Sequence, residues 1–218
     1  MKILCISDQI DPLVYSPHIK ERFADVDLIL SAGDLPMDYL DFIISNLNKP
    51  LFFVFGNHHT NELRHYRRGW DDPFITDDKE FLGCGAVYLG TKIKTEGKFI
   101  LAGLGGSMRY NNGANQFTEF QMFIEVTKLI PGLFWNRIFH GRFLDILLTH
   151  APPHSIHDKK DKCHWGFKTY LWFIKVFKPK YLVHGHIHLY DLSDVRCTKW
   201  ENTTVVNAYS HYIIDFGD

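Results

Sequence analysis

Five short apolar segments of this chain each end in a polar cluster, and this pattern constrains the fold more than any other feature. Apolar runs of four to six residues are typical of strands that are covered on both faces. Apolar residues at helical spacing recur between them. The pattern predicts a layered α/β or α+β fold. The five strand segments are 2–7, 25–34, 50–59, 144–153 and 181–188, and the helical ones are 37–48, 117–130 and 166–178.

Four further segments predict strands: 86–90 and 98–106, which we interpret as a pair, and 203–208 and 212–216. The dipeptide Pro131-Gly132 is expected to stop the helix over 117–130, and Pro179 to end the helix over 166–178. No repeat or linker divides the chain, so a single domain over 1–218 is expected. Residues 107–143 form either a cap over a site or an insertion that serves packing.

The charge balance argues against nucleic acid as a partner, because 24 basic residues face 25 acidic ones and the net charge is −1. The basic cluster 64–68 is interpreted as a solvated face. The four cysteines form no Cys-x-x-Cys pair, which is typical of reduced thiols in a cytoplasmic protein. Neither a signal peptide nor a membrane span is predicted.

The polar clusters at the strand ends indicate a site, because ligands bind beyond the carboxyl ends of strands in sheets flanked by helices. Each cluster alone is typical of a turn or a helix cap. Together they supply oxygen and nitrogen donors suited to divalent transition metals. The clusters are Asp8, Gly33-Asp34, Gly56-Asn57-His58, Thr149-His150 and Gly185-His186-Ile187-His188.

The segment Gly185-His186-Ile187-His188 is the sharpest local signal. If it is extended, His186 and His188 point to the same side and can serve one metal or two neighbouring metals. Ordinary alternation on an exposed strand explains the same pattern. Gly185 lets the backbone approach a bound group closely.

In this order, the five clusters resemble the calcineurin-like metallophosphoesterase superfamily, over residues 7–188. The resemblance implies a two-sheet β-sandwich flanked by helices, with two metals at the carboxyl ends of the strands. It implies that Asp34 bridges the two ions and that His58 faces the substrate. The remaining ligands would be Asp8 and His188 for the first metal, and Asn57, His150 and His186 for the second.

This ligand set suits attack on phosphorus by a hydroxide that the two cations share, with charge stabilised by the metals. His58 would protonate the leaving oxygen or stabilise the phosphate charge. Imidazole and carboxylate ligands together suit Mn, Fe, Zn or Ni, of which we favour Mn.

The chain departs from the superfamily at its first motif, usually Asp-x-His, because Ile10 stands at the histidine position. Ile10 cannot bind a metal, so the first site loses a ligand. Asp11, Gln9 or a water molecule are the candidate replacements. His59 is a second departure, since the residue after Gly-Asn-His is usually acidic.

Two loops carry candidate substrate-binding residues. Arg109 lies in the glycine-rich segment 105–110 and could contact a phosphate. His164 lies in the loop 149–166, close to His150. Both segments are equally consistent with ordinary surface loops.

Three functions remain open. The first is a metal-dependent hydrolase of a small phosphomonoester or phosphodiester. The second is a catalytically impaired phosphoesterase-like scaffold or binding protein, which Ile10 favours. The third is a nuclease, against which the charge balance counts. The sequence predicts neither the oligomeric state nor the substrate.

Overall fold

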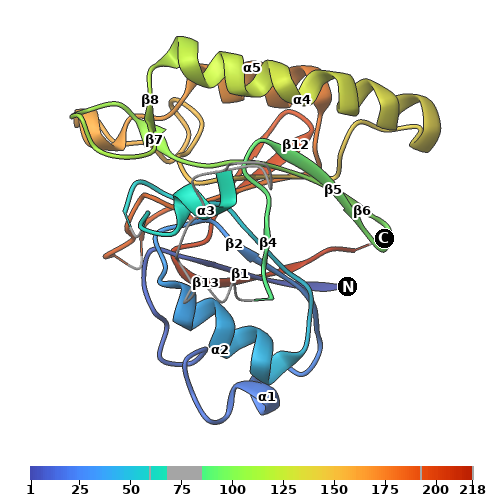
Figure 1. Ribbon diagram of the computed structural model, residues 1–218, viewed down its shortest axis with the longest axis vertical. Coiled ribbons are helices and arrows are strands. Elements are labelled where there is room, and N and C mark those ends of the chain that lie inside the picture. The colour runs from blue at the N-terminus through green and yellow to red at the C-terminus, as the bar shows by residue number, and fades with distance from the viewer. Residues whose placement is uncertain (59, 68–84, 192, 218) are drawn as a thin grey trace.

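Two sheets face each other between outer layers of helices in the computed structural model, which describes residues 1–58, 60–67, 85–191 and 193–217 (Figure 1). This confirms the predicted two-sheet sandwich. The first sheet has the order β13-β1-β2-β3-β4. Its strands are β1 (Lys2–Ser7), β2 (Val26–Ser31), β3 (Leu51–Phe53), β4 (Val87–Tyr88) and β13 (Ser210–Asp215).

The second sheet has the order β11-β12-β10-β9-β6-β5. Its strands are β5 (Lys92–Glu96), β6 (Phe99–Leu104), β9 (Ile146–Thr149), β10 (Tyr181–His184), β11 (Cys197–Trp200) and β12 (Thr203–Asn207). A two-stranded ribbon, β7 (Ser107–Met108) and β8 (Gln116–Phe117), stands apart from both.

The helices cover the outer faces of the sandwich (Figure 1). The first sheet carries α1 (Ile19–Arg22) and α2 (Met37–Leu47), and the second carries α4 (Glu119–His140) and α5 (Lys168–Phe177). The short helix α3 (Leu63–Arg67) and the 3-10 turn η1 (Lys162–His164) lie in connecting segments. No helix in the described ranges is long and apolar enough to cross a membrane.

The sequence of β1 is apolar without interruption because both faces of the strand are covered. Ile3 and Cys5 point into the core between the two sheets, whereas Leu4 and Ile6 point into the core beneath α1 and α2. Side chains alternate along a strand, so a strand covered on both faces needs apolar residues at every position. Each such side chain contributes roughly 1.5–3 kcal/mol through burial.

Helix α4 continues through Pro131, so the predicted stop at Pro131-Gly132 is wrong. A proline inside a helix costs about 3 kcal/mol. Leu129 and Leu133, on either side of it, are buried in the same core, and their packing offsets that cost. The helix begins at a Thr118 capping box and ends at Gly141, whose φ is 73°.

The strands expected as a pair over 86–90 and 98–106 meet only at an isolated bridge between Gly90 and Gly103, and otherwise they belong to different sheets. β4 pairs with β3 of the first sheet, and β6 pairs with β5 and β9 of the second. The intervening strand β5 was not predicted. Its sequence, Lys-Ile-Lys-Thr-Glu, is largely polar because it forms an edge of the sheet.

The strand directions place the five polar clusters together. β1, β2 and β3 are parallel neighbours in the first sheet, and β6, β9 and β10 are parallel neighbours in the second. The loops after β2 and β9 meet where the Nδ1 of His150 lies 2.8 Å from the Ala32 carbonyl oxygen. The site is therefore built from the edges of both sheets.

Candidate metal centre

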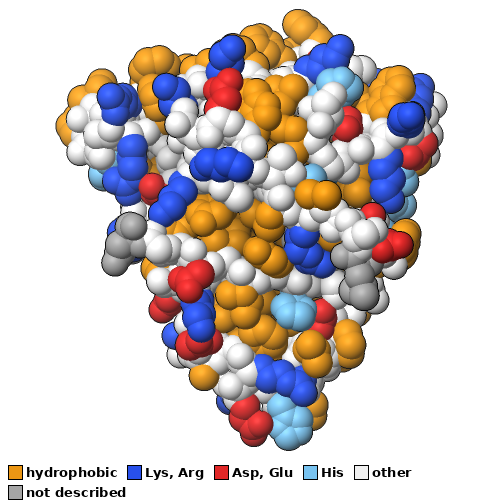
Figure 2. All heavy atoms as spheres, turned by 180° about the vertical axis from the view of Figure 1, so that it is seen from behind, with side chains coloured by type: hydrophobic (Ala, Val, Ile, Leu, Met, Phe, Trp, Pro, Cys, Tyr) orange, Lys and Arg blue, Asp and Glu red, His pale blue; other side chains and the backbone are white. Residues whose placement is uncertain are grey.

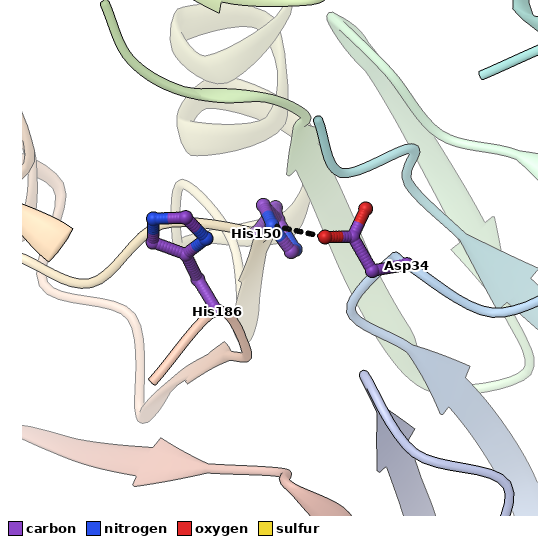
Figure 3. A group of neighbouring side chains, drawn as sticks. All are labelled: Asp34, His150 and His186. Carbon is purple, nitrogen blue, oxygen red and sulfur yellow. Dashed lines mark ion pairs between the residues drawn. The ribbon is translucent and has the colours of Figure 1, made fainter. Parts of the chain in front are cut away.

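Three side chains that could hold a metal ion converge where the two sheets meet. Asp34 follows β2, His150 follows β9 and His186 follows β10. One ligand atom from each lies within 4.8 Å of the other two, and all three residues are buried. Figure 3 shows the ring of His150 between the carboxylate of Asp34 and the ring of His186.

His150 presents its Nε2 atom to two oxygen atoms. Its Nδ1–H donates to the carbonyl oxygen of Ala32 at 2.8 Å. Its Nε2 then lies 3.3 Å from Asp34 Oδ2 and 3.2 Å from Asn57 Oδ1. Burial alone would lower the pKa of His150, but the Asp34 carboxylate outweighs it and raises that pKa to about 9. A positive charge is therefore strongly favoured at the point where these atoms meet.

The carboxylate of Asp34 is held in its ionised form, whereas the ring of His186 is held in its neutral form. Burial works to raise the pKa of Asp34, but His150 and the backbone N–H of His58, which donates to Oδ1 at 2.8 Å, hold it well below its usual range. His186 donates from Nε2 to the carbonyl oxygen of Cys163 at 2.7 Å. Burial, aided by nearby His150, lowers the pKa of His186 to about 3. The ring is neutral, and its Nδ1 carries the lone pair that a metal requires.

Asp8 and His188 form a second group beside the first. Asp8 Oδ1 lies 3.8 Å from His188 Nε2. Asp8 Oδ2 accepts hydrogen bonds from the hydroxyl of Ser7 at 2.5 Å and the backbone N–H of His186 at 2.8 Å. Burial raises the pKa of Asp8. The backbone of His186 thus ties this pair to the first cluster.

The backbone at three of these residues is left-handed: φ is 63° at Asp8, 57° at Asp34 and 67° at His186. This conformation is uncommon for residues other than glycine and is concentrated at functional sites. The expectation that His186 and His188 point to the same side of one extended strand is wrong, because β10 ends at His184 and the chain turns at His186. His186 accordingly joins the Asp34 cluster, and His188 faces Asp8.

Glycines allow the close approach of these loops. A Cβ atom on Gly56 would lie 2.0 Å from Asp34 Oδ1, and one on Gly185 would lie 1.8 Å from the Ser7 hydroxyl. Gly33 has a φ of 101°, and a Cβ there would lie 2.8 Å from His150 Nδ1. The glycine of each motif therefore makes room for a ligand from another motif.

Ile10 lies at the surface and is 43% exposed. Asp11 is one candidate to replace the missing histidine, but its carboxylate is engaged in hydrogen bonds with other residues. Its carboxylate accepts hydrogen bonds from Ser210 and His211, both at 2.5 Å, and from the backbone N–H of Leu13 at 2.7 Å. Gln9 is exposed. His59 lies outside the described residues, as does Arg68 of the basic cluster 64–68.

The remaining candidate residues lie around the cluster. His58 is exposed, and its backbone N–H contacts Asp34. The ring of His164 lies 5.4 Å from that of His186. Arg109 donates to Gln121 Oε1 at 3.0 Å. Arg109 also lines a hollow of about 410 Å³ together with Lys162.

Sequence reasoning missed three residues that support the site. The Ser7 hydroxyl bonds Asp8, and Asn57 Nδ2 donates to the hydroxyl of Tyr110 at 3.2 Å. Asn115 donates from Nδ2 to the carbonyl oxygens of Phe55 at 3.0 Å and Gly56 at 2.7 Å. Tyr110 and Asn115 belong to the loop around β7 and β8, which no short motif links to the strand ends.

The donor set fits divalent cations. It offers carboxylate, imidazole and amide oxygen, which suit transition metals. Without a bound cation, the raised pKa of His150 places a proton between its Nε2 and the oxygen atoms of Asp34 and Asn57, and a divalent cation can take that position instead. Two of the ligating imidazoles each donate their other nitrogen to a backbone carbonyl, as metal-binding histidines commonly do.

Comparisons with known proteins agree with this geometry. The model of the calcineurin-like phosphoesterase family matches residues 1–190. One crystal structure superimposes with a TM-score of 0.64 at 14% identity, over 98% of this chain and 94% of the other. The protein TT1561 of Thermus thermophilus superimposes with a TM-score of 0.57 at 13% identity, covering 95% and 88% of the two chains.

A third solved structure, GAP50 of Plasmodium, superimposes with a TM-score of 0.51 at 10% identity, over 95% of this chain and 70% of that one. These structural similarities concern the fold. No curated protein matches the sequence.

Proposed function

Because the chain belongs to the calcineurin-like phosphoesterase family, we propose that it hydrolyses a phosphomonoester or phosphodiester with two divalent cations. In this proposal Asp8, Asp34 and His188 hold the first cation. Asp34 also serves the second, together with Asn57, His150 and His186. Mn is favoured among Mn, Fe, Zn and Ni.

The observation that carries the proposal is the convergence of Asp34, Asn57 and His150. The Nε2 atom of His150 lies 3.3 Å from Asp34 Oδ2 and 3.2 Å from Asn57 Oδ1, and all three residues are buried. A structural role alone would leave these lone pairs uncompensated or require a proton on His150. Asn57 contributes a neutral oxygen, so a loaded site keeps enough positive charge to attract a phosphate.

The bound cations would lower the pKa of a water molecule and withdraw charge from the phosphate oxygens. The protein's own groups supply the rest of the chemistry. His58 lies exposed at the rim, beside Asp34, where its ring can protonate the leaving oxygen. Its backbone N–H fixes one Asp34 oxygen, so the carboxylate keeps its orientation during turnover.

A small phosphorylated substrate fits the neighbouring hollow of about 410 Å³. Arg109 and Lys162 line it and supply positive charge. Tyr110 lines it too and bonds Asn57, so the hollow adjoins the proposed second cation. His164 lies beside His186 at the same side of the centre.

One observation favours a second candidate function, a binding protein with impaired turnover. Ile10 stands where a ligand of the first cation is expected, and the Asp11 carboxylate is engaged by Ser210 and His211. A weakly held first cation would slow hydrolysis while the second still binds a phosphate group.

The test is turnover of p-nitrophenyl phosphate and its bis ester by protein loaded with Mn²⁺. We expect hydrolysis of at least one ester and a drop of about 100-fold or more in kcat for His58→Asn, in line with loss of a general acid. His18→Asn, at an exposed histidine of the loop before α1, is the matched control. No turnover of either ester by metal-loaded protein, or equal rates for His58→Asn and the wild type, would contradict the proposal.

A further inference from the structure

Helix α4 is apolar on its outer face as well as its inner face. Its inner face packs Met122, Val126, Leu129 and Leu133 into the core of the second sheet. A helix on a sheet normally turns polar side chains to water. Here the outer face carries large apolar side chains, among them Phe120, Ile124, Phe134, Trp135, Ile138 and Phe139, all of them exposed.

Most of these apolar side chains have more than half of their surface exposed to solvent. Phe120 is 71% exposed, Trp135 61% and Ile138 75%. Helix α5 extends the surface with exposed Trp172 and Val176, and the Trp172 ring contacts that of Phe123 at 5.7 Å. We call this set the α4–α5 face. A continuous apolar surface of this kind marks a binding site for a protein or a membrane.

Positive charge surrounds the α4–α5 face. The only acidic residues of the two helices are Glu119 and Glu125, and both are engaged. Glu119 accepts from the backbone N–H of Thr169 at 2.6 Å, and Glu125 accepts from the Thr91 hydroxyl at 2.8 Å. The exposed cations on the helices and at their carboxyl ends are Lys128, Arg137, Arg142, Lys168, Lys175 and Lys178. Two of them are paired with acids, Lys128 with Glu125 and Arg142 with Asp145.

A hollow of about 250 Å³ at the end of the α4–α5 face is lined by both apolar and cationic side chains. Its cationic lining is Arg137, Arg142 and Lys178, and its apolar lining includes Phe143 and Val176. No acidic side chain lines it. Figure 2 shows hydrophobic and cationic side chains interspersed over the upper end of the molecule, where the helical layer lies.

We propose that the α4–α5 face docks on an anionic phospholipid bilayer, with its apolar side chains in the headgroup region. Tryptophan and phenylalanine next to lysine and arginine are the residues that favour that interface. Lipid phosphates would lie against the surrounding cations, and the hollow lined by Arg137, Arg142 and Lys178 fits one such phosphate. The surface does not depend on the proposed hydrolysis.

Charge also argues against a second copy of the chain as the occupant. A two-fold dimer through this face would bring together two copies of the same excess of cations, of which Arg137, Lys168, Lys175 and Lys178 have no acidic partner among the described ion pairs. Glu125 already pairs with Lys128, so Glu119 is the one described acid of the two helices left to offset the repulsion. An anionic surface compensates all of them.

The experiment is flotation of the full chain with vesicles of phosphatidylcholine alone, and with vesicles containing about one third phosphatidylglycerol. We expect binding to the anionic vesicles that weakens at high salt. Ile138→Glu should lower the partition coefficient at least about tenfold, since it places a charge in the apolar contact. The double variant Arg137→Gln, Lys178→Gln should lower it by about tenfold or more on anionic vesicles.

The matched control is Leu13→Glu, an exposed leucine before α1 in the other layer, which should bind vesicles like the wild type. Thermal melting checks that each variant is folded. The proposal is overturned by absence of binding to anionic vesicles, by equal binding to neutral ones, or by an Ile138→Glu variant that binds normally. Light scattering that shows a dimer broken by Ile138→Glu, without vesicle binding, would assign the face to a second copy instead.

Discussion

The Nδ1–H of His150 donates to the carbonyl oxygen of Ala32 at 2.8 Å, across the junction of the two sheets. His150 follows a strand of the second sheet, and Ala32 follows a strand of the first. This bond fixes the ring so that Nε2 faces Asp34 and Asn57. This contact therefore joins the two sheets at this point and also orients the proposed ligand.

Asp34→Ala is expected to remove both cations, because the proposal makes this carboxylate the bridge between them. Metal content after Mn²⁺ loading and gel filtration measures the effect, and affinity should fall by at least about 100-fold. Asp41→Ala removes an exposed carboxylate of α2 and should keep the metal. Full occupancy in Asp34→Ala would refute the bridging assignment.

Gly56→Ala should disturb the centre without removing any ligand. The new Cβ would lie 2.0 Å from Asp34 Oδ1 and 2.6 Å from His150 Cε1. We expect metal affinity to fall at least about tenfold, and the free energy of unfolding to fall by about 1–3 kcal/mol. Gly85→Ala is the control, since its Cβ meets only Ile44 at 3.6 Å. Equal metal content in both variants would show that the metal centre does not need the space that Gly56 leaves for Asp34 and His150.

Ile10→His should strengthen the first cation site, because it supplies an imidazole where the family usually has one. Ile10 is 43% exposed, so the core does not resist the change. We expect Mn²⁺ affinity to rise about tenfold, as measured by titration calorimetry, while Leu13→His has no effect. Unchanged or weaker binding in Ile10→His would mean that position 10 does not face the site.

Asp11→Asn should cost stability in a pH-dependent way. Burial opposes the charged carboxylate, but the hydrogen bonds from Ser210, His211 and Leu13 outweigh it and lower the pKa of Asp11. The stabilisation is therefore full above the ordinary pKa of about 3.9, and it is lost as pH falls through the lower folded-state value.

Urea unfolding of Asp11→Asn near neutral pH should show a loss of about 1.5–3 kcal/mol, typical of hydrogen bonds to a charged group. The difference from the wild type should shrink as pH falls below about 4. Asp41→Asn, on the exposed side of α2, should be neutral. A difference that stays constant with pH would show that the charge of Asp11 is not involved.

Pro131→Ala should stabilise the protein, since it restores a hydrogen-bonding N–H within α4. We expect a gain of about 1–3 kcal/mol in urea unfolding. Pro179→Ala, just beyond α5, should give no comparable gain because no helix continues there. Destabilisation by Pro131→Ala would indicate that the proline has a packing role.

Apolar patterning predicted the central strands and the layers, because uninterrupted apolar segments such as β1 and β9 are typical of strands that are covered on both faces. It failed at Pro131, where local propensity favoured a stop and burial of Leu129 and Leu133 prevailed. It also missed β5 and β11, whose edge positions tolerate polar residues.

The motif order singled out side chains that the fold brings close together, such as Asp34, His150 and His186, but it did not predict their arrangement. An extended chain was assumed at His186, whereas its left-handed φ of 67° turns the ring toward His150. Contacts such as Asn57 to Tyr110 join residues 53 positions apart in sequence. Only the tertiary fold brings such pairs together, so no local sequence pattern predicts these contacts.

The pairing of β1 with β13 has a consequence for biosynthesis. Lys2 lies opposite Asp215, so β1 waits for a neighbouring strand made more than 200 residues later. Such long-range pairing delays folding and leaves an apolar edge open during translation. The contact between Asp8 and the backbone of His186 spans 178 positions and forms equally late. The nascent chain is thus exposed to aggregation and chaperone capture until β13 has emerged, and the proposed metal centre cannot form before His186 has been made.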